Sequence, residues 1–269
     1  MSRTVPPTAP LPGPLPGRSG PRIIAALVLR ETCARFGRSW GGYAWALAEP
    51  AGGIAILSLA FALIAPKPPL GTSFTLFYAT GVIPFLMYNS LTSALMAALP
   101  ANRGLMTYPG VGPLDVLLAR VVLEAMTHVA VAAAVLVPIV AALPRPPEIA
   151  ADRIALALAL AAALGAGMGT LNAALAGIFP TWRQIWSVLN RPVFIVSGVL
   201  FTARRMPAGL ADWIAWNPIA HVIETMRDGF YGPDPDGFAS APFVLAVAAS
   251  LFLAGAILIR GQQGKMLQI

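Results

Sequence analysis

Six separate runs of apolar residues, each long enough to cross a membrane, constrain this chain more than any other feature. A helix of roughly 20 mostly apolar residues spans the ~30 Å hydrocarbon layer of a bilayer. Segments rich in Pro and Gly separate the runs, and such segments are typical of turns. We therefore predict an all-α integral membrane protein with six transmembrane helices. The windows lie at about residues 45–65, 74–98, 114–142, 154–179, 185–203 and 241–259.

The composition agrees with this fold class. Of the 269 residues, 57% are hydrophobic and 11% are charged, whereas soluble domains carry about 25% charged residues. The single cysteine, Cys33, excludes an intramolecular disulfide. The net charge of +7 is interpreted through the positions of the basic residues, because these set the topology of a membrane protein. No nucleic acid partner is expected.

The basic residues indicate the orientation. Arg30, Arg35 and Arg38 precede the first window, whereas Lys67 alone follows it. Basic residues accumulate on the cytoplasmic side, so the N-terminus is placed in the cytoplasm. Six spans are an even number, so the C-terminus is cytoplasmic too. Residues 1–20 are Pro-rich and predict a disordered cytoplasmic tail, and residues 21–38 predict an amphipathic interfacial helix before the spans.

No motif for catalysis or for nucleotide binding is found in the sequence. The stretch GQQGKM at residues 261–266 lacks the first glycine and the final Ser or Thr of a phosphate-binding loop. Two histidines and one cysteine form no metal-ligand spacing and no Ser-His-Asp pattern. We predict that the chain is not an enzyme and carries no metal or cofactor of its own.

Two sets of ionisable residues fall inside the predicted spans, where such residues are expensive and often functional. Arg120, Glu124 and His128 share one helical face. They predict either a proton relay, as in a proton-coupled secondary transporter, or an Arg–Glu pair near the cytoplasmic end, and the second is favoured because Arg120 lies only about 9 Å inside that end. Arg191 predicts either a water-filled path or a buried pair with Glu49 or Glu124.

Two further patterns concern packing and the segment after the fifth window. Small residues recur every fourth position in the fourth window and predict close helix packing within the subunit. Residues 216–232 predict an amphipathic helix too polar to span a bilayer. The small residues are Gly165, Gly169, Ala173 and Gly177; the apolar face of the helix holds Ile219, Val222, Ile223, Met226 and Phe230, and the polar face holds His221, Glu224 and Asp228.

Three stretches together resemble the capsular polysaccharide export permeases, a branch of the type-2 ABC exporters. They are RETCARFGRSWGGYAWALAEP, RPVFIVSGVLF and MPAGLADWIAWNPIAHVIETMRDGFYG. Their order, their spacing and the six-span frame match, from about Pro21 onward. The Glu-Pro pair at residues 49–50 and the Arg-Phe-Gly at residues 35–37 favour the capsule branch over O-antigen, teichoic-acid or drug exporters, which remain alternatives.

The resemblance implies a six-span permease domain over residues 39–269, working as a homodimer in the bacterial inner membrane. Two copies of a separate ATPase subunit would bind the ATP, and periplasmic or outer-membrane export components would be further partners. The substrate would be a lipid-linked polysaccharide. The break at residues 100–113 would couple the permease to the ATPase, through Asn102, Arg103, Tyr108 and Pro109.

The resemblance also implies re-entrant gate helices between spans five and six, within residues 204–232, with their polar face toward the channel mouth. Aromatic side chains would line the sugar path, because they offer flat amphipathic surfaces. Arginines would hold an anionic polymer or its lipid phosphate. The path residues would be Tyr88, Trp182, Trp186, Arg191, Phe194, Phe201 and Arg204; the gate residues would be Trp213, Trp216, Asn217, Pro218, His221, Glu224 and Arg227.

Overall fold

A computed structural model describes residues 20–36, 40–107, 110–202, 208–235 and 237–266. Residues 1–19 of the predicted tail, together with Tyr108, Pro109 and Arg204, lie outside the described residues. Within the described part, the regular structure is entirely helical. The helices are α1 Gly20–Phe36, α2 Trp40–Ile64, α3 Phe74–Ala101, α4 Pro113–Ala141, α5 Ala151–Ile178, α6 Trp182–Val196, α7 Ala208–Ala215, α8 Pro218–Tyr231 and α9 Ala241–Met266.

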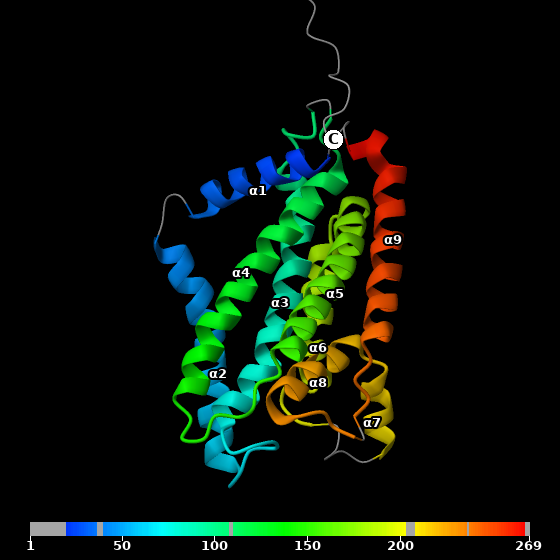
Figure 1. Cartoon of the computed structure of the whole chain (residues 1–269). Helices are drawn as coiled ribbons and strands as arrows, with labels where there is room; N and C mark the ends of the chain where they lie inside the picture. Colours follow the sequence, from blue (N-terminus) through cyan, green and yellow to red (C-terminus); the bar gives the residue numbers. More distant parts are fainter. Residues whose placement is uncertain (1–19, 37–39, 108–109, 203–207, 236, 267–269) are drawn as a thin grey trace, which may run out of the picture.

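Five helices in the described part of the chain are long and apolar enough to cross a membrane: α2, α3, α4, α5 and α9. They all run roughly along the long direction of the bundle (Figure 1). The end that carries α1 also carries the end of α9 and the segment between α3 and α4. The opposite end carries α7 and α8. The prediction of an apolar helical bundle is thereby confirmed.

The fifth apolar window forms a shorter helix than the other five. Helix α6 has 15 residues, or about 22 Å, less than the ~30 Å of a hydrocarbon layer. It ends at Val196 with Ser197 as its C-cap, and Gly198 then takes a φ of 77°, a left-handed conformation that favours glycine. The described part of the predicted span, residues 185–202, is therefore the end of a short helix followed by a turn.

The centre of the bundle is α3, which packs against α2, α4, α5 and α8. Its first half is almost continuously buried from Leu76 to Phe85. Ser73 caps the helix, and its hydroxyl accepts a hydrogen bond from the Leu76 amide at 3.3 Å. The apolar side of α8 completes this core with Ile219, Ile223 and Met226.

Glycines let α5 approach both of its neighbours closely. A Cβ added at Gly165 would lie 2.9 Å from the Leu91 Cβ of α3, and one at Gly169 would lie 3.0 Å from the Leu95 Cβ. On another side of α5, a Cβ at Gly255 of α9 would lie 2.6 Å from the Leu171 amide nitrogen. The prediction that the small residues serve packing inside the subunit is confirmed for Gly165 and Gly169.

Helix α1 lies across the ends of α3 and α4 instead of along them (Figure 1). Its Leu27 is buried in a small second core with Leu95, Leu99 and Leu117. Its described side chains are otherwise mostly partly or fully exposed. The predicted position of this helix at the membrane surface stays a prediction.

Candidate functional site

A polar groove of about 450 Å³ lies between α3 and α6. Amides, hydroxyls and two arginines line it, together with aromatic rings. Such a mixture is unusual between helices of an apolar bundle, where polar groups are normally satisfied or absent. The lining residues are Phe85, Asn89, Ser93 and Met96 of α3 and Arg183, Trp186, Ser187, Asn190, Arg191 and Phe194 of α6.

Three contacts hold α6 antiparallel to α3. At the start of α6, Arg183 Nη2 donates a hydrogen bond to the Met96 carbonyl oxygen at 3.1 Å. Further along, Asn190 Nδ2 donates to Asn89 Oδ1 at 2.5 Å. Near the end, the ring of Phe194 meets that of Phe85 edge to face, with centroids 5.0 Å apart. These contacts fix which face of α6 turns toward the groove.

Two buried polar atoms beside the groove lack hydrogen-bond partners in the described part of the chain. Among the described residues, neither Trp186 Nε1 nor Asn190 Oδ1 has a hydrogen-bond partner, although both atoms are buried. The Arg191 side chain is exposed, and no ion pair joins it to the described residues. The side chains of Trp186, Asn190 and Arg191 line one cavity. Arg191 presents a cation to it, which can bind an anionic group, whereas the two unpartnered atoms are buried beside it.

Other predicted path residues lie away from the groove. Tyr88 is 3% exposed and belongs to the core. The Trp182 indole donates to Asn172 Oδ1 at 3.0 Å and anchors the start of α6. Phe201 follows α6 in the turn, where its carbonyl oxygen accepts a hydrogen bond from Arg227 at 3.1 Å. The groove thus contains Trp186, Arg191 and Phe194 of the predicted path residues.

The sequence WNP determines where α8 begins. The Asn217 side chain caps the helix by accepting a hydrogen bond from the Ile219 amide at 3.1 Å, and Pro218 occupies the first turn, where its missing N–H costs nothing. Asn217 Nδ2 also donates to Ser197 Oγ at the end of α6. Trp213 and Trp216, just before the helix, are 78% and 76% exposed.

The guanidinium of Arg227 anchors α8 to the turn after α6. It is 2% exposed, and it donates to the carbonyl oxygens of Gly198 and Val199 at 2.8 and 3.3 Å. Its carbon lies 4.5 Å from the centre of the Phe77 ring, a cation–π contact. Glu224 pairs with it at 3.2 Å. Burial raises the pKa of the Glu224 carboxyl, and the charge of Arg227 opposes that rise.

The polar side of α8 faces mainly into the protein. His221 is buried, with its Nε2 atom 2.7 Å from the Ala215 carbonyl oxygen, and its Nδ1 atom accepts from the Ser240 amide at 3.1 Å. In this structure His221 and Arg227 point into the protein, and the role of the predicted gate residues stays a prediction. Both side chains satisfy backbone groups of neighbouring segments, and a buried polar group needs such partners.

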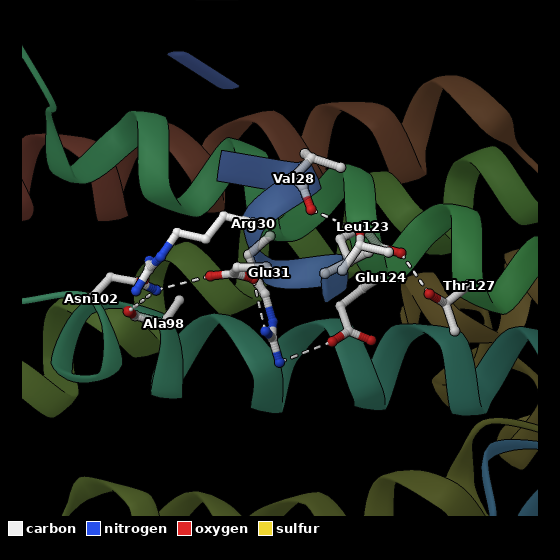
Figure 2. A network of polar contacts seen from close by, with 10 residues as sticks. Val28, Arg30, Glu31, Ala98, Asn102, Leu123, Glu124 and Thr127 are labelled. Carbon is white, nitrogen blue, oxygen red and sulfur yellow. Dashed lines mark hydrogen bonds and ion pairs between the residues drawn. The ribbon is translucent and has the colours of Figure 1, made fainter. Parts of the chain in front are cut away.

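A charged network joins α1 to α3 and α4 at the other end of the bundle (Figure 2). Glu31 of α1 accepts a hydrogen bond from Asn102 Nδ2 and another from Arg120 Nη1, each at 2.9 Å. Arg120 also pairs with the buried Glu124 at 3.1 Å. Arg30 Nη1 donates to Asn102 Oδ1 at 3.2 Å. One carboxylate thus connects three helices.

This network bears on two predictions. The predicted Arg120–Glu124 pair is confirmed. Arg120 also pairs with Glu31, which the spacing of residues in the sequence does not predict. Glu124 is occupied by Arg120, so the alternative pair of Arg191 with Glu124 does not form. Of the predicted coupling residues, Asn102 is buried in the network and Arg103 is exposed; Tyr108 and Pro109 lie outside the described residues.

Comparison with known proteins places the chain among transporters. It is 29% identical to the polysialic acid transport protein KpsM of Escherichia coli over 245 residues, covering 91% of this chain and 95% of that protein. It is 26% identical to the capsule polysaccharide export inner-membrane protein BexB of Haemophilus influenzae over 243 residues, covering 89% and 90%. It is 25% identical to the capsule polysaccharide export inner-membrane protein CtrC of Neisseria meningitidis serogroup A over 246 residues, covering 90% and 92%. Because the ABC-2 type transporter family matches residues 23–231, the chain belongs to that family.

Proposed function

We propose that this chain is the membrane permease subunit of a bacterial ABC exporter that moves a lipid-linked capsular polysaccharide from the cytoplasm to the periplasm. Membership of the ABC-2 family supports a transport role driven by a separate ATPase subunit. Relatives named for polysialic acid transport and for capsule polysaccharide export match nearly its whole length. Two of these relatives are named as inner-membrane proteins, which supports the same location here.

The groove between α3 and α6 is the observation that carries this proposal. An arginine facing hydrocarbon costs about 2.5–3.5 kcal/mol on insertion scales, yet Arg191 is exposed and unpaired among the described residues. The cost disappears if the groove faces water. Trp186 and Phe194 then offer aromatic ring faces to a polysaccharide, and Ser187 offers a hydroxyl group. Arg191 offers a site for an anionic sugar or a lipid phosphate.

A second copy of the chain would enclose the groove. Helix α6 has no buried residue, and its exposed apolar side chains include Ile185, Val188 and Leu189. Exposed apolar side chains also lie along α2, including Ile56 and Leu63. In a homodimer, part of this apolar surface would pack against the partner, and the polar groove would line a shared path. Export components in the periplasm or outer membrane would receive the polymer.

The network around Glu31 offers a route from the ATPase to this path. Asn102 begins the turn between α3 and α4, which would contact the ATPase. Because Asn102 is hydrogen-bonded to Arg30 and Glu31, a displacement of this turn would move α1. Because Glu31 also binds Arg120, the same displacement would reach α4. The tight contacts of α3 with α5 would carry the movement into the bundle.

The proposal is tested by deleting the gene and measuring polysaccharide on the cell surface and inside the cell. Loss from the surface with accumulation inside, restored by the wild-type gene, is the expected result. Unchanged surface capsule would contradict it. Accumulation of O-antigen, teichoic acid or a drug would identify the corresponding alternative substrate. Family membership and the engagement of Arg120 with both Glu31 and Glu124 count against a proton-coupled transporter.

A further inference from the structure

A second polar pocket lies next to this groove, among α2, α3 and α4. Its volume is about 330 Å³, within the range of about 300–1,000 Å³ typical of small-molecule sites. None of the predicted path, gate or coupling residues that the structure describes lines it. Its polar or aromatic lining includes Trp45, Glu49, Asn89, Ser93, Thr127 and His128. We call it the Glu49 pocket.

The Glu49 pocket and the groove between α3 and α6 are neighbours. Asn89 and Ser93 line both of them. These residues are four apart, so they lie on one side of α3. A polymer that lies along this side of α3 would therefore contact both cavities at once.

The two cavities differ in charge. Among the described residues, the groove is lined by Arg183 and Arg191 and by no carboxylate. The described lining of the Glu49 pocket includes Glu49 and His128 but no Arg or Lys. Carboxylate oxygens accept hydrogen bonds, so Glu49 favours hydroxyl donors over anionic groups. The two arginines of the groove favour anionic groups instead.

Trp45 and Glu49 give the pocket the features of a sugar site. They are four residues apart on α2 and so point to the same side. The indole of Trp45 is 71% exposed and presents a flat apolar face. The apolar face of a sugar ring stacks on such a surface while its hydroxyls reach neighbouring acceptors. Thr127 donates its own hydroxyl hydrogen to the Leu123 carbonyl oxygen, so its oxygen is left to accept.

We propose that the Glu49 pocket binds an uncharged, hydroxyl-rich sugar residue of the exported chain, while the adjacent groove holds an anionic residue or the lipid phosphate. This inference rests on the proposed export of a polysaccharide. It makes Glu49 and Trp45 specificity-determining residues. A pocket that bound anionic groups would be expected to present a basic side chain instead of the Glu49 carboxylate.

Photo-crosslinking in cells that make their own polysaccharide tests the inference. The full chain carries p-benzoylphenylalanine in place of Trp45, in place of Trp186 in the groove, or in place of Leu47 on α2 outside the Glu49 pocket. After irradiation, the purified protein is digested and analysed for covalently attached sugar and lipid. Sugar attached at positions 45 and 186, with little at position 47, is the expected result.

Two variants sharpen the test. Adding Glu49→Ala to the position-45 protein should lower the yield of attached sugar about tenfold, because a hydrogen bond to a charged group is lost. The matched control Glu148→Ala removes an exposed carboxylate outside the pocket and should leave the yield unchanged.

The outcomes separate the inference from the function on which it rests. Sugar at position 186 but only lipid at position 45 would overturn the Glu49 pocket and leave the proposed function intact. An equal yield with Glu49→Ala would overturn the role of the carboxylate. Sugar at neither position, in cells whose export depends on this gene, would contradict both the groove and the pocket.

Discussion

The Arg227 guanidinium of α8 lies 2.8 Å from the carbonyl oxygen of Gly198, in the turn that ends α6. This bond joins two segments 29 residues apart, and it accompanies the left-handed backbone of Gly198, whose φ is 77°. Together with the hydrogen bond from Asn217 to Ser197, it holds α8 against the end of α6.

Replacing Arg227 should destabilise the protein strongly. Arg227→Met leaves the carbonyl oxygens of Gly198 and Val199 without their donor and leaves Glu224 without its counter-ion. Removing one partner of a buried pair costs about 3–5 kcal/mol. Thermal unfolding of the detergent-solubilised protein should show a large drop in Tm. The control is Arg153→Met, an exposed arginine, and equal Tm values for the two variants would contradict the account.

Glu224 makes stability depend on pH. Burial raises its pKa above the usual 4.5 in the folded protein, so above pH 4.5 the folded state holds more protons than the unfolded state. The free energy of unfolding therefore falls as pH rises through the interval between the two pKa values. Asp228, whose pKa burial also raises, contributes in the same direction. Glu224→Gln should flatten this decline in Tm, and an unchanged slope would refute the assignment.

The close approach of α5 and α9 should tolerate no side chain at Gly255. A Cβ there would lie 2.6 Å from the Leu171 amide nitrogen and 2.7 Å from the Thr170 carbonyl carbon. Forcing extra atoms into a packed core costs about 1–3 kcal/mol, so Gly255→Ala should lower Tm measurably. Gly53→Ala is the control, because nothing lies within 4 Å of its added Cβ. A similar Tm for both variants would show that the two helices are not in tight contact.

Removing Glu31 should release α1 from the bundle. Glu31→Ala removes the carboxylate that accepts hydrogen bonds from Asn102 Nδ2 and Arg120 Nη1, and a hydrogen bond to a charged group contributes about 1.5–3 kcal/mol. Amide hydrogen exchange in α1 should accelerate by about tenfold or more, whereas exchange in α5 should stay unchanged. Glu148→Ala is the matched control for loss of an exposed carboxylate. Unchanged protection of α1 would mean that Leu27 and its apolar neighbours hold the helix alone.

The apolar windows predict most of the fold because each transmembrane helix satisfies its own backbone hydrogen bonds. Five of the six windows agree closely with long helices. The window at residues 185–203 does not, because average hydropathy does not detect the turn at Gly198. It also conceals that α6 is amphipathic, with Asn190 and Arg191 on the side of the groove.

The groove and the charged network could be predicted only in part. Periodicity separates the two faces of α8, but it does not show that carbonyl oxygens more than 25 residues upstream would satisfy Arg227. Spacing predicts the pair of Arg120 with Glu124, four residues apart. The contact of Arg120 with Glu31 spans 89 residues, and only the packing of α1 across α4 brings the two together.

Export by an Arg191 variant tests the central claim most directly. In the deletion strain, the gene carrying Arg191→Ala is compared with Arg191→Lys and with Arg145→Ala, an exposed arginine outside the groove. Surface polysaccharide is measured together with the amount of permease and of co-purifying ATPase. We predict at least a tenfold loss of surface polymer for Arg191→Ala, partial export for Arg191→Lys, and wild-type export for Arg145→Ala, at equal amounts of assembled protein. Wild-type export by Arg191→Ala would contradict the assignment of the groove as the polysaccharide path.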